Sequence, residues 1–378
     1  MIFVLVIVGV AMSNTLNKKQ QAKATEQIVE MFAAKDPRDN GSDSINDQLR
    51  IHFIDVGQAD SILIQQGSSS MLIDAGNNPD SELVKNYISN QGVTKLDYVV
   101  GTHPHEDHIG GLDHIINSYE IGKIYMPKVI SSTLTFEEVV TAIKSNGMVA
   151  TVPKMGETFE VGQATATVLG PNSSSYKDMN NFSVVIRVTF GNNSFMFTGD
   201  AEDVAENEIL TGGYNVSSDL IKVGHHGSDS STTQKFLDEV NPKYAIISAG
   251  KSNIYGHPTK STMEKLRIKG AKVFRTDENG TIVASSDGEN ITFSTKPGSY
   301  DYADEYTNSG DGGTSDLPPM ITPALSSNSK IIYHTPSGKS YHYDNECRTL
   351  ARSKTVLTQT LGEALSSSHN DPCDICVD

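Results

Sequence analysis

The stretch that decides the fold reads Val99-Val100-Gly101-Thr102-His103-Pro104-His105-Glu106-Asp107-His108-Ile109-Gly110-Gly111. Three imidazoles and a carboxylate stand within six residues, at His103, His105, Asp107 and His108. The apolar residues before them predict the end of a β-strand, so one loop can direct all four side chains toward one point. Imidazole nitrogen and carboxylate oxygen are suitable ligands for zinc, manganese or iron. The spacing therefore predicts a metal site on this loop.

Short apolar or alternating runs surround this stretch and are interspersed with helical patterns. By composition and flanking turn residues, strands are expected at 51–54, 61–65, 71–73, 98–101, 124–126, 164–169, 184–190, 194–198, 220–223, 245–248, 272–275, 281–285 and 290–294. Helices are expected at 81–91, 111–118, 135–146, 201–210, 231–240 and 259–268. Many strands with interspersed helices predict a layered α/β domain over residues 49–296.

The chain changes character on both sides of this domain. Residues 14–48 are mostly polar and are expected to form a stalk. Residues 297–329 are rich in Gly, Ser, Asp and Pro, which predicts a flexible linker because such a segment cannot bury a core. A separate small module is expected at 330–378.

An apolar run occupies residues 2–12, within a predicted signal or anchor remnant at 1–13. The run is shorter than the about 20 residues that a membrane span needs, but it suits the apolar region of a secretory signal. Ala11 and Ser13 are small enough for a cleavage site, although no basic segment precedes the run. We therefore expect an extracytoplasmic protein, secreted or membrane-anchored through its N-terminus. The alternative is an apolar tail without that role.

The formal net charge is −16. This acidity argues against a broad basic surface for nucleic acid, since phosphate neutralisation needs clustered Lys and Arg. Bound divalent cations can hold a phosphate locally even on an acidic protein. A metal-dependent site for a phosphate-bearing substrate therefore stays open.

The histidine-rich loop resembles the metal-binding loop of the metallo-β-lactamase superfamily, and further segments follow in that family's order. Residues 71–76 resemble the strand whose aspartate, here Asp74, supports the metal loop. Residues 195–200 resemble the strand that ends in a metal-bridging aspartate, here Asp200, and residues 254–258 stand where the family supplies a late histidine. The resemblance implies an αββα sandwich and a binuclear metal-dependent hydrolase with two divalent ions, zinc or manganese.

A narrower resemblance covers residues 49–295. The segments 51–61, which contains Asp60 as a further supporting carboxylate, 223–228 and 253–258 resemble the extracytoplasmic hydrolase domain of ComEC-type DNA-uptake competence proteins. This implies hydrolysis of DNA or another phosphodiester; no protein partner is predicted. Two alternatives stay open: hydrolysis of a lactone, β-lactam or thioester, and a metal-stabilised binding protein with a degenerate centre.

The superfamily pattern assigns a ligand set to each metal. The first metal receives His103, His105 and Asp200; the second receives Asp107, His108, Asp200 and His257, and Asp107 additionally orients the hydroxide. One departure concerns the first metal, because no histidine lies between His114 and His225 to serve as its usual third histidine ligand. Either the protein shell of that metal is incomplete, or His225 fills the gap.

Further polar residues are expected around the metals. His225 and His226 follow a predicted strand and are expected to donate a proton to a leaving alkoxide or to bind a substrate oxygen. The alternative makes one of this pair a metal ligand or a packing residue. Asn181, Ser183 and Ser228 are candidates for hydrogen bonds to substrate, although such residues also form turns.

The three cysteines of the chain lie in the predicted module at 330–378, and an odd number fits a metal site better than a disulfide framework. With His342, the residues Cys347, Cys373 and Cys376 make a Cys3His set, which is a common closed shell for structural zinc. So small a unit has too small a hydrophobic core to be stable alone and needs such a bound metal ion. The module resembles the Ada-like metal-binding module. A redox C-x-x-C pair, or a site without His342, is the alternative.

We predict that deleting residues 297–378 removes one zinc per chain and preserves turnover of a small substrate. The polar linker uncouples the two parts, and a closed four-ligand shell leaves no position for water. Elemental analysis and a kinetic assay check this. Full zinc content in the truncated protein, or a disulfide between the cysteines, would contradict it.

Overall fold

The computed structural model describes residues 48–302, 331–334, 340–341, 357–360 and 371–372. The chain divides into two compact units, Met1–Glu305 and Tyr306–Asp378. The predicted signal at 1–13 and the stalk up to residue 47 lie outside the described residues, as do His342, Cys347, Cys373 and Cys376. None of the helices in the described ranges has the length and apolar character that crossing a bilayer requires.

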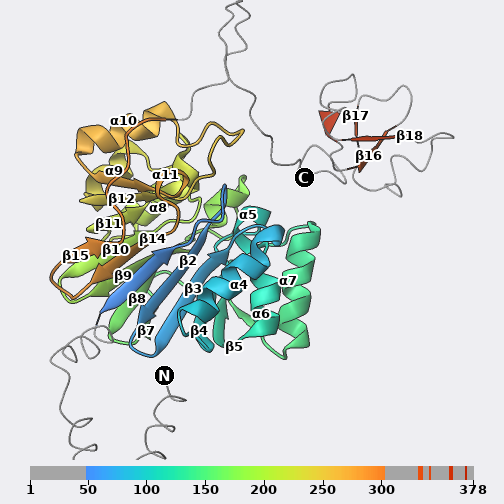
Figure 1. The fold of residues 1–378 in the computed structure, drawn as a ribbon, viewed down its shortest axis with the longest axis horizontal. Helices are drawn as coiled ribbons and strands as arrows, with labels where there is room; N and C mark the ends of the chain where they lie inside the picture. Colours follow the sequence, from blue (N-terminus) through green and yellow to red (C-terminus); the bar gives the residue numbers. More distant parts are fainter. Residues whose placement is uncertain (1–47, 303–330, 335–339, 342–356, 361–370, 373–378) are drawn as a thin grey trace, which may run out of the picture. The chain divides into compact units, whose positions relative to one another are not determined.

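Two mixed sheets form the centre of the first unit (Figure 1). The first sheet has the order β15-β14-β1-β2-β3-β4-β5-β6. Its strands are β1 (Leu49–Phe53), β2 (Ser61–Gln66), β3 (Ser69–Ala75), β4 (Lys95–Val100), β5 (Glu120–Tyr125), β6 (Ala150–Thr151), β14 (Ile282–Ser286) and β15 (Ile291–Phe293). The second sheet has the order β13-β12-β11-β10-β9-β8-β7. Its strands are β7 (Thr158–Val161), β8 (Ala164–Gly170), β9 (Val185–Phe190), β10 (Asn193–Phe197), β11 (Leu220–Lys222), β12 (Tyr244–Ile247) and β13 (Lys272–Arg275).

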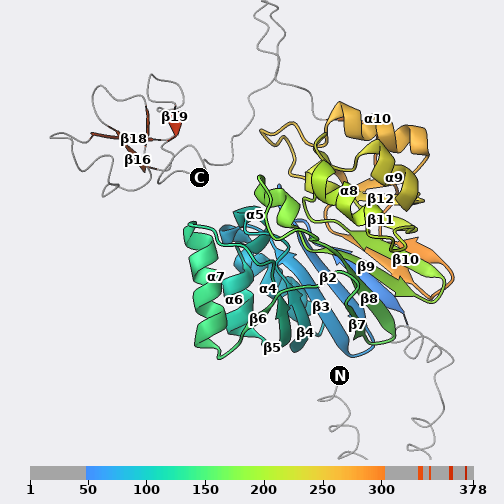
Figure 2. The ribbon, with the colours of Figure 1, turned by 180° about the vertical axis from the view of Figure 1, so that it is seen from behind.

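Helices cover the outer face of each sheet, as Figures 1 and 2 show from opposite sides. On the first sheet lie α4 (Ser81–Asn90), α6 (Leu112–Ser118) and α7 (Leu134–Ser145), and on the second lie α8 (Asp203–Thr211), α9 (Gln234–Val240) and α10 (Lys260–Lys269). Shorter helices are η1 (Asn78–Asp80), α5 (Glu106–Ile109), η2 (Met179–Phe182), η3 (Gly224–Gly227) and α11 (Thr276–Asn279). The layer order confirms the predicted αββα sandwich.

Alternation along the strands builds the layers. On β2, Ile62 and Ile64 point into the core between the sheets, whereas Leu63 points to the helices, as expected from the period of two in a strand. Polar caps then set where the helices begin: the hydroxyls of Thr133, Thr233 and Thr259 accept hydrogen bonds from the first turns of α7, α9 and α10.

Parallel pairing brings the site-bearing loops to one edge. β3 pairs in parallel with β4, with Ile73 opposite Val100, so the residues that follow both strands leave the sheet together. β10 pairs in parallel with β11, with Phe197 opposite Lys222. The backbone N–H of Val184 donates to the Thr102 carbonyl oxygen at 2.9 Å, which links the loops of the two sheets.

The predicted strands and the six predicted helices are confirmed, with small shifts at their ends. In the first unit, the prediction missed β6, β7, α5, α11 and the 3-10 helices η1, η2 and η3, each of which has at most four residues and is too short for a periodic pattern to be recognised. The chain also stays in contact with the first unit beyond residue 296. Gly298 N–H donates to Val273 at 2.8 Å, Tyr300 donates to Ala271 at 2.7 Å, and Arg275 holds the Asp301 carbonyl. Deleting residues 297–378 would remove these contacts as well, so the deletion that tests the predicted zinc module should begin after Asp301.

Only short strands are described in the second unit. β16 (Ile331–His334) pairs antiparallel with β18 (Leu357–Thr360), and β17 (Ser340–Tyr341) pairs in parallel with β19 (Asp371–Pro372). The predicted zinc ligation in this unit stays a prediction.

We expect the Phe53→Ala substitution to lower the free energy of unfolding by about 3–5 kcal/mol, because it leaves a cavity between the sheets. Phe53 is 0% exposed and stacks on Phe197 of the other sheet with ring centroids 6.3 Å apart. Denaturant titration measures the change. The control is Ile130→Ala, since Ile130 is 86% exposed and should change the free energy by less than about 0.5 kcal/mol. A loss below about 1 kcal/mol for Phe53→Ala would contradict the packing described here.

Candidate metal centre

Asp74 holds the histidine-rich loop in place. Its buried carboxylate accepts hydrogen bonds from Thr102 N–H at 2.8 Å, from the Thr102 hydroxyl at 2.7 Å and from His108 Nδ1 at 2.8 Å. Burial raises the pKa of Asp74, and the His108 and Thr102 contacts oppose that rise. Because Nδ1 of His108 is engaged, its Nε2 is left to face Asp200. Asp74 thus fixes the orientation of the His108 ring, and its predicted role behind a metal ligand stays a prediction.

The turn after the loop needs close backbone approach. A Cβ atom at Gly111 would lie 2.5 Å from the carbonyl oxygen of Ala75, so only glycine fits there. The N–H of Gly111 donates to Gly76 at 3.3 Å, and that of Asp60 donates to Asp107 at 3.0 Å. These contacts fasten the loop to the residues around β3.

Four side chains converge on one point: Asp107, His108, Asp200 and His226 each offer a ligand atom within 4.8 Å of the others. His226 Nε2 lies 3.1 Å from Asp107 Oδ2, and His108 Nε2 lies 3.2 Å from Asp200 Oδ2. Ligands that are each about 2 Å from one tetrahedral metal are separated by about 3–4 Å. His108 Nε2 and Asp200 Oδ1 are also buried without a hydrogen-bond partner. The group therefore fits a divalent metal ion.

The charges of this group call for a cation. Burial disfavours the charged form of His108, but Asp200, Asp107 and Asp74 outweigh it and raise its pKa well above the usual value. Burial likewise opposes charge on Asp200, but His108 and His226 hold its pKa well below the usual value. A proton or a metal ion can supply the positive charge that these buried carboxylates require. Metal binding at this point would displace protons.

His103 and His105 form a second pair beside this group. His103 Nε2 lies 3.0 Å from His105 Nδ1 and 3.9 Å from Asp200 Oδ2. Burial lowers the pKa of His103 well below the usual value and also lowers that of His105. His103 Nδ1 lies 3.3 Å from the Ser183 hydroxyl. Two neutral imidazoles whose ring nitrogens lie this close to each other are suited to bind a metal ion.

The histidine that completes the four-residue group is His226; the predicted ligand His257 lies outside that group, and its role at the second metal stays a prediction. His226 Nδ1 faces the Ser248 carbonyl oxygen at 3.0 Å, so its Nε2 faces Asp107. His257 belongs to no group of converging ligand atoms within the described ranges. Its Nδ1 lies 3.4 Å from Gln58 Nε2, and burial lowers its pKa to about 4. The placement follows from the backbone at 225–226, which turns with positive φ at both residues.

Lys222 supports the centre from behind and was missed in the sequence. Its ammonium is fully buried, lies 2.9 Å from Asp60 Oδ2 and donates to the Val223 carbonyl at 3.0 Å. Asp60 Oδ1 in turn lies 3.6 Å from His226 Nδ1. Asp60, a predicted supporting residue, is thus paired with a buried cation. A charged residue within the apolar run 220–223 was the available signal.

The three predicted substrate-binding residues are buried. Asn181 Oδ1 accepts from the N–H groups of Glu202 at 3.3 Å and Ala205 at 3.0 Å, at the start of α8. The Ser183 hydroxyl accepts from Asp200 N–H at 3.0 Å, and that of Ser228 lies 2.9 Å from the Ser230 hydroxyl. These contacts hold the loops of the site, and substrate binding by the three residues stays a prediction.

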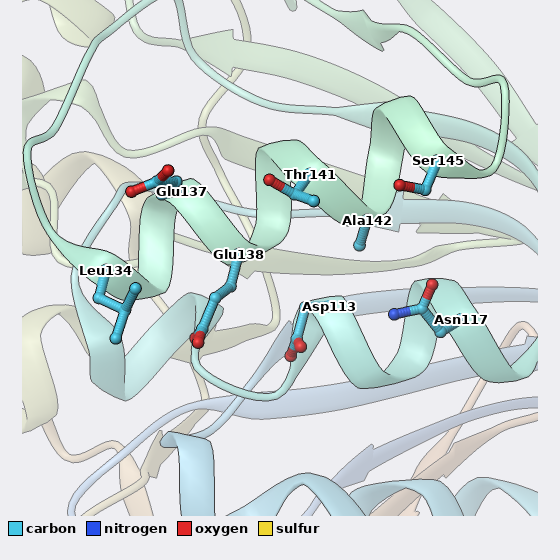
Figure 3. Close-up of a pocket in the computed structure, with 8 residues that line it drawn as sticks. All are labelled: Asp113, Asn117, Leu134, Glu137, Glu138, Thr141, Ala142 and Ser145. Atoms are coloured by element: carbon cyan, nitrogen blue, oxygen red, sulfur yellow. The ribbon is translucent and has the colours of Figure 1, made fainter.

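A groove between α6 and α7 shares none of the predicted site residues (Figure 3). Asp113 and Asn117 line it from α6, and Glu137, Glu138 and Ser145 line it from α7. It offers carboxylates but no imidazole or thiol. We assign no chemistry to it.

Comparison with known proteins agrees with this geometry. The family profile described as Metallo-beta-lactamase superfamily matches residues 54–251, more than half of the chain. The chain belongs to the metallo-β-lactamase superfamily. The predicted class, a metal-dependent hydrolase of this superfamily with competence-related relatives, is confirmed at that level.

Relatives of this superfamily member include two competence-related proteins. ComE operon protein 3 of Bacillus subtilis is 31% identical over 280 residues, which cover 69% of this chain and 36% of that protein. Competence protein ComA of Neisseria gonorrhoeae is 31% identical over 231 residues, which cover 60% of this chain and 31% of that protein. The chain thus spans about a third of the length of these relatives. Among solved structures, the metallo-beta-lactamase fold protein YhfI from Bacillus subtilis aligns with a TM-score of 0.42 at 14% identity, over 60% of this chain and 95% of that chain.

We predict that Asp74→Asn weakens metal binding about 10- to 100-fold, since carboxylates that orient a ligating imidazole have effects of this size. Asparagine tolerates the left-handed backbone of position 74, where φ is 58°, so the fold should persist. Competition with a chelator of known affinity measures the change. Asp113→Asn, on α6, is the matched control. Equal affinities of Asp74→Asn and wild type would refute the assigned role.

Proposed function

We propose that this protein hydrolyses phosphodiester bonds, with extracytoplasmic DNA as the candidate substrate. The observation that carries the proposal is the convergence of Asp107, His108, Asp200 and His226 on one point, beside the His103 and His105 pair. The similarity to competence-related proteins favours a nucleic-acid substrate over the other substrates of such centres. Two metal ions, zinc or manganese, would be held around Asp200.

The side chains provide what a hydrolytic site needs. When bound, divalent ions supply Lewis acidity that brings the pKa of water toward neutrality and neutralises phosphate charge. The Asp107 side chain is 32% exposed, so its carboxylate can accept a hydrogen bond from an attacking water and orient it. The His225 side chain is 25% exposed and borders the site, with its Nε2 3.7 Å from Asp200 Oδ2. His108 and Asp200 are buried and fix the geometry.

The negative charge of the protein indicates that a phosphodiester would be bound close to the metal ions. The chain carries a formal net charge of −16, and carboxylates of Asp107, Asp200 and Glu202 gather at the site itself. Without metal these groups repel a phosphate. With metal bound, a strong attraction for a phosphodiester lies at the point where it is cleaved, so affinity should depend on divalent metal more than on a basic surface.

We predict that Asp107→Ala and His108→Ala each reduce hydrolysis to the uncatalysed rate while the far-ultraviolet circular dichroism stays unchanged. Each substitution removes a converging ligand, but the core between the sheets is intact. The control is His114→Ala, because His114 lies on α6 and contacts Glu82 at 2.8 Å. Activity near the wild-type level in either site variant, in a metal-defined assay, would sink the mechanism.

A substrate panel separates the proposed reaction from its rivals. Wild-type protein loaded with zinc or manganese should cleave bis-p-nitrophenyl phosphate and a DNA oligonucleotide, and should leave nitrocefin and a lactone intact. The opposite preference would assign the centre to lactam or lactone hydrolysis. No turnover of any of the four, with metal bound, would indicate a binding protein.

A further inference from the structure

The two metal positions differ in how completely their ligands are supplied. At the second metal position, Asp107, His108, Asp200 and His226 together offer four ligand atoms. The position at His103 and His105 lacks the third histidine expected from the superfamily pattern, because no histidine lies between residues 114 and 225. Ser183 reaches His103 from that segment instead, with its hydroxyl 3.3 Å from His103 Nδ1.

We propose that His225 is the third histidine ligand of the first metal position, an inference that rests on the metal centre of the proposed function. His225 Nε2 lies 3.7 Å from Asp200 Oδ2, the same oxygen that His103 Nε2 approaches at 3.9 Å. His225 is not one of the four residues Asp107, His108, Asp200 and His226, whose ligand atoms all lie within 4.8 Å of one another.

The orientation of the His225 ring suits a ligand. Its Nδ1 lies 3.3 Å from Glu202 Oε1 and 3.2 Å from the Ser230 hydroxyl. A carboxylate on one ring nitrogen fixes the tautomer and directs the lone pair of the other nitrogen outward, as is usual for metal-bound histidine. Asp74 does the same for His108. Glu202 is itself held by the amide of Asn180 at 3.3 Å.

The backbone at His225 and His226 adopts a strained conformation that directs both imidazole rings toward Asp200. His225 has φ 48° and His226 has φ 54°, in the left-handed region that residues with side chains rarely adopt. His225 N–H donates to the Gly199 carbonyl at 3.2 Å, which ties the turn to the loop that bears Asp200. Two successive left-handed residues let neighbouring histidines reach the same carboxylate, His226 at 3.8 Å and His225 at 3.7 Å.

Metal content tests the proposal without reference to activity. The full-length chain is saturated with zinc, freed of excess metal and analysed by mass spectrometry. We expect His225→Ala to bind one zinc fewer than wild type, and His257→Ala to bind as many as wild type. Metal in the carboxy-terminal unit is common to all variants and cancels in the difference. Glu202→Gln, which keeps the shape but removes the charge, should weaken that zinc about 10- to 100-fold.

Controls keep the result interpretable. His225→Asn tolerates the left-handed backbone and serves if His225→Ala does not fold. Unchanged zinc content in His225→Ala or His225→Asn would overturn the proposal, as would loss of zinc in His257→Ala alone. A different result would contradict the proposed function: wild-type protein with its full zinc content that does not hydrolyse phosphodiesters. Restoration of the lost zinc in His225→Ala by added imidazole would support direct ligation.

Discussion

One buried carboxylate oxygen organises this protein. Four imidazole nitrogens surround Asp200 Oδ2, with Nε2 of His108 at 3.2 Å, of His225 at 3.7 Å, of His226 at 3.8 Å and of His103 at 3.9 Å. Asp200 is only 1% exposed, and an isolated buried carboxylate is costly by several kcal/mol. The arrangement is therefore stable only with compensating positive charge at this point, which protons supply in part and the proposed divalent metal would complete.

The sandwich is built so that these groups meet. The ends of β3 and β4 deliver Asp74 and the histidine-rich loop, while the ends of β10 and β11 deliver Asp200 and the two successive histidines. Each ring is then turned by a fixed partner: Asp74 for His108, Ser248 for His226 and Glu202 for His225. Behind them, the buried Lys222 ammonium neutralises Asp60. The rigid strands supply position, and the partners supply ring orientation.

Much of this could be predicted from the sequence. The spacing of His103 to His108 predicts that one loop directs these side chains toward a common metal site. The order of the motifs predicts the αββα sandwich and the place of Asp200 at the site. That His226 completes the four-residue group was available from the sequence only as an alternative, because the left-handed turn at His225 and His226 leaves no periodic signal and His257 stands where the motif expects a late histidine. Lys222 was missed although its charge stands out in the apolar run 220–223, because its partner Asp60 is remote in sequence.

The most direct test of this account is the anomalous scattering of metal-loaded crystals, measured at the absorption edge of zinc or manganese. The account predicts a peak about 2 Å from both Asp200 Oδ2 and His226 Nε2, and a second peak about as close to His103 Nε2 and Asp200. Metal density away from Asp200, or at His257 instead of His226, would contradict it.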